Sequence, residues 1–139
     1  MGKKPKSKSG RLIGISPQLI VDDVISTAEF YRDTFGFHFD NFFGNPPVFV
    51  IVRRDNVQIN FRQTLADKPG NSSNTHWVDG TYDIYLRVDN LDAYTAELQV
   101  NHAEILQPPI TRSYQMRELV VRDCNGYVLC FGEEVEAAA

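Results

Sequence analysis

The order of hydrophobic and polar residues predicts a strand, a helix and three further strands in the first half of the chain. Residues 15–21 alternate as a strand does. Residues 37–43, 48–53 and 57–62 are rich in β-branched and aromatic residues and predict three more strands. Asp22 or Asp23 is expected to cap the intervening helix, and Gly36 to end it. The apolar residues of this helix recur at three- and four-residue spacing: Val24, Ala28, Tyr31 and Phe35.

The second half predicts the same elements in the same order. Residues 82–88 alternate as a strand, a helix follows, and Asn101 is expected to take the left-handed position at the end of that helix. Its apolar stripe consists of Leu91, Tyr94 and Leu98. Three strands are then predicted at 103–106, 116–122 and 127–131, the first ended by Pro108-Pro109 and the last two joined by a turn at Asn125-Gly126.

Two pairs of short motifs support a duplication. Val21-Asp22-Asp23-Val24 and Val88-Asp89-Asn90-Leu91, which open the two helices, lie 67 positions apart. Arg54-Asp55 and Arg122-Asp123, which each precede a closing strand, lie 68 positions apart. Nearly equal spacing of unrelated motifs indicates a repeated module.

We therefore predict an α+β fold of two βαβββ modules, residues 12–63 and 81–134, within a single domain at 12–134. The polar, Gly- and Asn-rich residues 64–80 are expected to form the loop between them. The two curled sheets are expected to form a half-barrel mixed sheet, with the helices outside and a hollow on the inner side.

The two ends of the chain differ in composition from this domain. Residues 1–11 contain five basic side chains and no acidic one, which predicts a disordered arm, and residues 135–139 form a short tail. The whole chain carries −4 and the arm +5, so the remainder carries −9. An acidic body repels phosphate backbones, which argues against nucleic acid as a partner and favours a neutral or cationic ligand. The arm is interpreted as a solvated tail, with a nucleic-acid or membrane tether as the alternative.

The cysteine content and hydropathy indicate a cytoplasmic protein that does not bind a membrane. Cys124 and Cys130 have neither the CxxC spacing of a zinc site nor the number expected of a disulfide framework. Reduced cysteines fit a reducing compartment. No apolar run approaches the length of a membrane span, and the first residues lack the apolar stretch of a secretory signal.

Several polar and aromatic residues are predicted to line the hollow. Gln58, Asn60 and Tyr85 alternate away from the apolar stripes, so the hollow is expected to be polar in part. Asp83 has the same orientation and either receives a cationic group of a ligand or pairs with Arg62 or Arg87. Trp77 and Tyr114 are candidates for stacking on a planar ligand.

The motifs of the first module and the last turn resemble those of a known superfamily. Ala28-Glu29-Phe30-Tyr31 with Phe35-Gly36-Phe37, together with Arg122-Asp123-Cys124-Asn125-Gly126, is similar to the signatures of the vicinal-oxygen-chelate superfamily of glyoxalases, bleomycin-resistance proteins and extradiol dioxygenases. The resemblance spans about residues 12–134. It implies paired βαβββ modules and a homodimer.

The resemblance also identifies where metal-dependent members hold their cation. Those positions, on the first and last strand of each module, are Ser16, Asn60, Asp83 and Cys130 here. A hydroxyl, an amide, one carboxylate and one thiol match no common metal preference. We therefore predict no metal, no cofactor and no catalytic residue, and we retain Ser16 and Cys130 as ligand-binding candidates.

The metal-free branch of the superfamily gives the better match. It carries a proline early in the first strand, as Pro17 does here, and an Arg-Glu pair before the last hairpin, as Arg117-Glu118 does. In that branch the first strand is exchanged between the subunits of a dimer. The function implied is binding and sequestration of a small molecule, such as a drug or an antibiotic of the bleomycin type. The alternative is a glyoxalase-type, metal-dependent lyase or a related enzyme.

Overall fold

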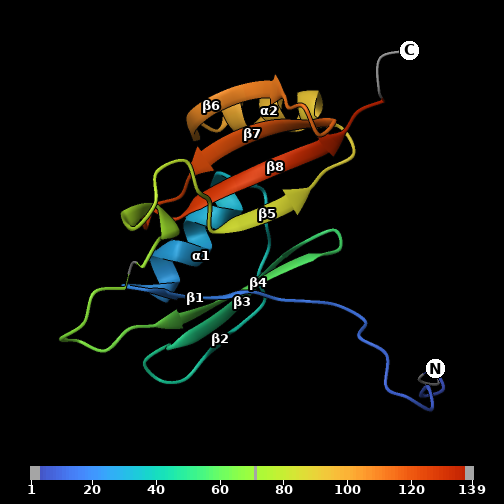
Figure 1. The fold of residues 1–139 in the computed structure, drawn as a ribbon. Coiled ribbons are helices and arrows are strands. Elements are labelled where there is room, and N and C mark those ends of the chain that lie inside the picture. Colours follow the sequence, from blue (N-terminus) through green and yellow to red (C-terminus); the bar gives the residue numbers. More distant parts are fainter. Residues whose placement is uncertain (1–3, 71, 137–139) are drawn as a thin grey trace.

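The structure is a computed structural model that describes residues 4–70 and 72–136. It contains two four-stranded sheets, with α1 packed on β3 and β4 and α2 packed on β7 and β8 (Figure 1). Each sheet and its helix come from one half of the chain.

The first module runs β1 (Gln18–Val21), α1 (Val24–Asp33), β2 (Phe42–Phe43), β3 (Phe49–Arg54) and β4 (Val57–Gln63). Its strands lie in the order β1-β4-β3-β2, with β1 parallel to β4 and the other pairs antiparallel. The helix begins where the Asp23 carboxylate accepts hydrogen bonds from the backbone N–H groups of Ile25 and Ser26. It is followed by Gly36 in the left-handed region (φ 75°), as predicted.

The second module repeats this arrangement. It runs β5 (Ile84–Arg87), α2 (Leu91–Val100), β6 (Glu104–Thr111), β7 (Met116–Arg122) and β8 (Val128–Glu134), in the sheet order β5-β8-β7-β6. The parallel pair again joins the first and last strands. The predicted α+β fold of two βαβββ modules is therefore confirmed. The connection between them contains a short 3₁₀ helix, η1 (Asn74–His76).

Two local predictions were wrong. The strand predicted to end before Pro108-Pro109 continues through both prolines to Thr111, because β6 is an edge strand where a missing N–H group need not break a ladder. The pairing of β6 with β7 shifts register there. The left-handed position after α2 is taken by His102 (φ 60°), whereas Asn101 stays at φ −87°.

The two modules share one hydrophobic core, built from the helix-bearing sides of both sheets. Phe35, at the end of the first helical segment, packs against Phe131 of β8 with 6.4 Å between ring centroids. Tyr94 of α2 packs on the same Phe131 ring at 4.8 Å. Buried residues of both modules form one continuous cluster that includes Tyr31, Phe61 and Leu129.

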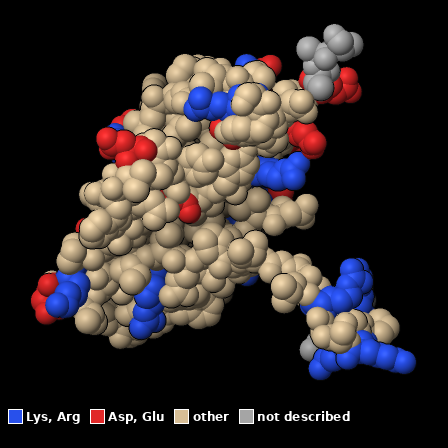
Figure 2. All heavy atoms as spheres, viewed as in Figure 1, with Lys and Arg blue, Asp and Glu red and all other residues tan. Residues whose placement is uncertain are grey.

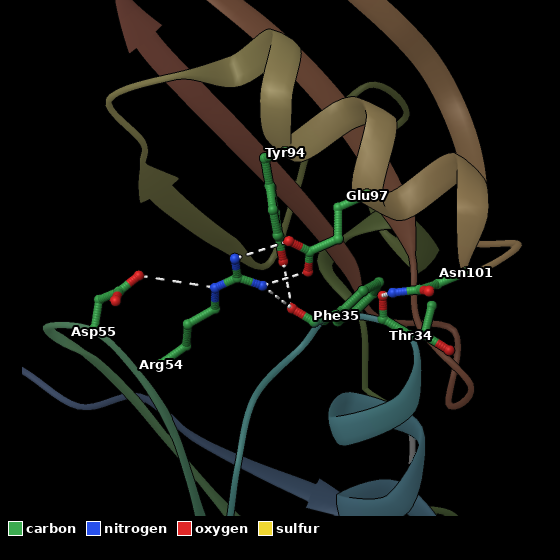
Figure 3. Close-up of polar contacts among 7 residues, drawn as sticks. All are labelled: Thr34, Phe35, Arg54, Asp55, Tyr94, Glu97 and Asn101. Carbon is green, nitrogen blue, oxygen red and sulfur yellow. Dashed lines mark hydrogen bonds and ion pairs between the residues drawn. The ribbon is translucent and has the colours of Figure 1, made fainter.

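Hydrogen bonds and ion pairs reinforce this junction (Figure 3). The Arg54 guanidinium donates to both carboxylate oxygens of Glu97, at 2.5 and 2.9 Å, and to the Phe35 carbonyl at 3.0 Å. It also lies over the Tyr94 ring, 4.8 Å from its centroid, and the Tyr94 hydroxyl donates to the same Phe35 carbonyl. On the other side of the core, the buried Tyr31 hydroxyl donates to Asp123 at 2.6 Å.

This arrangement differs from the hollow expected within one chain. The helix-bearing sides face each other, so the opposite faces of the two sheets point away from the shared core. Gln58 and Asn60 lie on the open face of the first sheet, whereas Tyr85 and Cys130 lie on that of the second. A single chain therefore does not bring the predicted inward-facing residues of both modules into one hollow.

The chain before Pro17 extends away from both sheets (Figure 1). The basic side chains of its described part gather away from the body (Figure 2). Leu12, Ile13 and Ile15 follow them and are 93–100% exposed. The stretch thus combines basic charge with apolar side chains that the chain itself does not cover.

Candidate functional site

The open face of the second sheet carries a buried acidic residue, Glu118 of β7. Alternation explains its orientation, because Arg117 and Leu119 belong to the helix side, where Arg117 pairs with Asp92 of α2. Glu118 thus points to the opposite face, yet only 2% of it is exposed. Burying a carboxyl group is costly unless partners satisfy its oxygens.

Three side chains, one from β5 and two from the β6–β7 turn, supply those partners. The Tyr85 hydroxyl of β5 donates to Glu118 Oε2 at 2.8 Å, and the Tyr114 hydroxyl of the β6–β7 turn donates to Oε1 at 2.7 Å. Arg112 Nε lies 3.4 Å from Oε1, and its Nη2 donates to the Gln107 carbonyl oxygen at 2.9 Å. Residues from both edges of the sheet therefore meet over its centre. We call Tyr85, Gln107, Arg112, Tyr114 and Glu118 the Glu118 cluster.

The acidic residue changes the properties of the tyrosines around it. The hydrogen bond to Glu118 raises the pKa of Tyr114 to about 12, and burial adds to the effect. Burial, followed by the bond to Glu118, raises the pKa of Tyr85 still further. Both phenols therefore remain protonated at neutral pH and act as hydrogen-bond donors toward Glu118.

A hollow of about 420 Å³ opens beside this cluster. Its walls come from the cluster and from the strand ends around it: Tyr82, Tyr85, Arg87, Tyr114, Met116, Glu118 and Glu134. Arg87 and Glu134 form an ion pair at 3.1 Å, and Glu118 pairs with Arg112. Each charged side chain of the walls therefore has a partner of opposite charge. The Tyr82 and Tyr85 rings lie 5.6 Å apart and present aromatic surface to the hollow.

The loop that contains Trp77 borders the same region. Trp77 is 82% exposed and lines a second hollow of about 430 Å³ with Val78 and Tyr82. Because Tyr82 lines both hollows, the two are neighbours. Asp83 anchors this loop: its carboxylate accepts from the Ser73 hydroxyl and from the backbone N–H groups of Asn74 and Val128. Asp83 therefore pairs with neither Arg62 nor Arg87.

The positions at which related enzymes hold a metal do not form a chelating set. Ser16 and Asn60 belong to the first module, and Ser16 is exposed before β1. Asp83 is engaged by the three groups just described. Cys130 is fully buried, and burial, with a contribution from Glu118, raises the pKa of its thiol to about 12, which disfavours a thiolate ligand. Within residues 4–70 and 72–136, no three His, Cys, Asp or Glu side chains converge on a metal-sized site.

Another groove, of about 420 Å³, lies between the modules, bordered by the β3–β4 turn and α2. Its charged centre is the Arg54–Glu97 pair, and the Arg54 guanidinium also donates to the Phe35 carbonyl. These contacts join the modules. The Glu118 cluster differs in that Gln107 Nε2 is buried and has no hydrogen-bond partner within the described part of the chain. We therefore regard the Glu118 cluster as the candidate site.

Comparison with known proteins agrees with this architecture. The family model of the glyoxalase/bleomycin resistance protein/dioxygenase superfamily matches residues 15–131. The chain belongs to this superfamily. No curated protein matches it significantly.

Solved structures show the same fold at low sequence identity. A bleomycin resistance determinant encoded on the transposon Tn5 superposes with a TM-score of 0.69 at 18% identity, covering 88% of this chain and 98% of that one. TioX from Micromonospora sp. ML1 superposes with a TM-score of 0.66 at 18% identity, covering 91% of this chain and 100% of that one. A glyoxalase-related enzyme from Clostridium phytofermentans superposes with a TM-score of 0.72 at 12% identity, covering 93% of this chain and 100% of that one. The same fold is thus shared by a resistance determinant and a glyoxalase-related enzyme.

The structure gathers some of the predicted site residues and separates others. Tyr85 and Tyr114 meet at Glu118, Cys130 lies beside them on β8, and Trp77 lines the neighbouring hollow. Gln58 and Asn60 are on β4 of the first sheet, where the Gln58 amide donates to Asn60 Oδ1 at 3.3 Å, and Ser16 is exposed before β1. Pro17 is half-buried, and its carbonyl accepts from the Asn60 backbone N–H.

Sequence reasoning did not identify Glu118, Arg112, Gln107 or Tyr82 as site residues. A signal for Glu118 was present, because it is a charged residue within a predicted strand, directly before the apolar run Leu119-Val120-Val121. Gln107 and Arg112 gave none, because a register shift on β6 sets their positions.

Proposed function

We propose that this protein binds and sequesters a small planar molecule as a homodimer, without a metal and without catalysis. The carrying observation is the Glu118 cluster on an open sheet face, with aromatic rings around a hollow of about 420 Å³. Ligand sites typically combine apolar and aromatic walls with a few fixed polar groups. Trp77, next to the hollow, offers a further aromatic face for stacking.

The dimer follows from the surfaces that one chain leaves uncovered. Leu12, Ile13 and Ile15 are almost fully exposed before β1, and Phe43 and Ile20 are about half exposed on the first sheet. Apolar patches of this kind favour burial against a partner. We propose that a second copy covers them, with the segment before Pro17 exchanged between subunits, so that the first sheet of one subunit faces the Glu118 cluster of the other. Ser16, Gln58 and Asn60 would then complete the site from the partner.

The proposal favours binding over metal-dependent lyase chemistry on the basis of donor chemistry. A Lewis-acid mechanism needs charged or imidazole ligands. The corresponding positions here provide two neutral groups, a buried thiol and a carboxylate engaged by three donors. An antibiotic of the bleomycin type is one candidate ligand, given the relationship to the Tn5 resistance determinant.

Ligand-dependent thermal unfolding tests this proposal. Bleomycin and a panel of planar amines and amides are added to the purified full-length chain, and a ligand that binds only the folded state raises the melting temperature. Sedimentation velocity of the same sample measures the oligomeric state, and elemental analysis measures metal content. A monomer that no compound stabilises, or a stoichiometric transition metal bound to the chain, contradicts the proposal.

A further inference from the structure

The hydrogen-bond directions in the Glu118 cluster determine which polar groups remain free for a ligand. A phenol has one proton to donate and lone pairs that accept. Tyr85 and Tyr114 each give that proton to Glu118. Toward the hollow, both hydroxyls therefore present only acceptor lone pairs.

The orientation of Gln107 is determined in the same way. Its carbonyl oxygen accepts from Arg112 Nη2 at 2.9 Å, and a guanidinium can only donate. The opposite amide orientation would place two donors against each other. The Gln107 amide nitrogen must therefore point away from Arg112, where it is buried without a partner in residues 4–70 and 72–136. Gln107 is not among the residues that line the hollow, so the two phenol oxygens, and not this amide, meet a ligand there.

We infer that the Glu118 cluster selects ligands by hydrogen-bond polarity: it accepts planar molecules that present N–H donors to Tyr85 and Tyr114, and it rejects carboxylates at that position. This inference rests on the proposed function and specifies the ligand class of the same site. The expected ligands are aromatic amidines, amines and amides. A carboxylate would place its oxygens against two phenol oxygens that have no proton to offer.

Three probes of similar shape test the inference: benzamidine, benzamide and benzoate. Binding is measured by chemical-shift titration of the ¹⁵N-labelled full-length chain, with the Gly132 and Cys130 amides as reporters because these residues lie beside Tyr85 and Glu118. Benzamidine and benzamide are expected to bind at least about tenfold more tightly than benzoate, the ratio that one hydrogen bond to the site confers.

The variant Glu118→Gln should change this preference through one identified tyrosine. The Gln oxygen is expected to stay near Arg112 and Tyr114, since Arg112 can only donate, which turns the new amide nitrogen toward Tyr85. Tyr85 must then accept and turn its own proton outward. Benzoate binding should strengthen about tenfold, and adding Tyr85→Phe should remove that gain.

The matched control is Glu29→Gln, which removes an exposed carboxylate of α1 far from this face. It should keep the wild-type preference. If benzoate binds the wild-type chain as tightly as benzamidine, or if Glu118→Gln folds and keeps the wild-type preference, the polarity inference is wrong while the binding function stands. If no probe perturbs the reporters at any concentration, the proposed function fails and the inference fails with it.

Tyr114→Phe, at a half-exposed position, provides a second variant should Glu118→Gln not fold. This variant should lower the affinity for benzamidine and leave the affinity for benzoate unchanged.

Discussion

Arg54 of β3 and Glu97 of α2 form a bidentate ion pair that joins the two modules, and the same guanidinium donates to the Phe35 carbonyl (Figure 3). Exposed ion pairs contribute little to stability, but this one is part of a network with the Tyr94 ring and hydroxyl. It should therefore contribute to the stability of the junction.

Replacing Arg54 with Met should destabilise the chain by about 1–3 kcal/mol, because Glu97 loses both donors and Phe35 loses one. Urea unfolding measures the change. The control is Arg32→Met, which removes an exposed pair with Asp33 and a contact with the Phe39 ring, and it should cost clearly less than Arg54→Met. Equal effects of the two variants would show that the network is not a specific link.

The buried bond between Tyr31 and Asp123 predicts a pH-dependent effect. Burial raises the pKa of Asp123, whereas the Tyr31 hydroxyl opposes that shift. Since the folded-state pKa lies above the unfolded value, the contribution of Asp123 to stability is fully present below the unfolded pKa and is lost as pH rises through the folded pKa. Tyr31→Phe removes the opposing donor. It should therefore cost about 1–3 kcal/mol at pH 7 and less in acid, where a protonated Asp123 needs that donor less.

Tyr94→Phe is the matched control for this effect. The Tyr94 hydroxyl also donates to a buried acceptor, but that acceptor is the carbonyl of Phe35, which does not titrate. Its cost in unfolding free energy should be the same at pH 7 and at about pH 4. If the two tyrosine variants respond identically to pH, the assigned coupling to Asp123 is wrong.

A substitution at Gly132 can disturb the candidate site without changing any charged group. An added Cβ there would lie 2.0 Å from the Tyr85 hydroxyl oxygen and 2.5 Å from the ring, so Tyr85 must leave Glu118. Gly132→Ala should fold with a loss of about 1–2 kcal/mol, while affinity for amidine and amide probes falls more than about tenfold. Glu29→Gln, at an exposed position of α1, should leave both stability and binding unchanged. Unaltered binding in Gly132→Ala would remove Tyr85 from the site.

Removing the acidic residue should be visible in the ionisation of the tyrosines. In Glu118→Gln the pKa of Tyr114 should fall from about 12 toward the ordinary value of about 10, and Tyr85 should follow in the same direction. Ultraviolet difference titration of phenolate absorption measures both. The Glu29→Gln variant should titrate like the wild-type chain, and a wild-type titration curve for Glu118→Gln would contradict the assigned contact.

The repeat, both helices and the order of elements could be predicted from sequence, because burial on one side imposes a period that the residues must follow. Gly36 was identified for similar local reasons, as was the cap of α1, which was narrowed to Asp22 or Asp23. The length of β6 could not be predicted, because the sequence does not show whether a strand that contains proline lies at the edge or in the centre of its sheet. Alternation in β4 and β5 correctly separated the core residues Ile59 and Leu86 from Gln58 and Tyr85. Which sheet faces then meet depends on how whole modules pack.

The candidate site shows the same division between local and long-range information. Tyr85 was predicted to line the hollow and Tyr114 to stack on a ligand, yet what joins them is a carboxyl group 33 and 4 residues away, respectively. Such convergence depends on register, and the register of β6 shifts within the segment that supplies Gln107 and precedes Arg112. No single-residue preference encodes it.

The prolines of β6 also bear on how copies of this chain can associate. With no N–H groups at 108 and 109, that border of the second sheet is a poor template for an added strand, which guards the folded chain against uncontrolled stacking. The opposite border, β5, carries no proline and lies beside the candidate site. A strand from a second copy of the chain would therefore pair with β5 rather than with β6, and at β5 that copy could also contact the ligand.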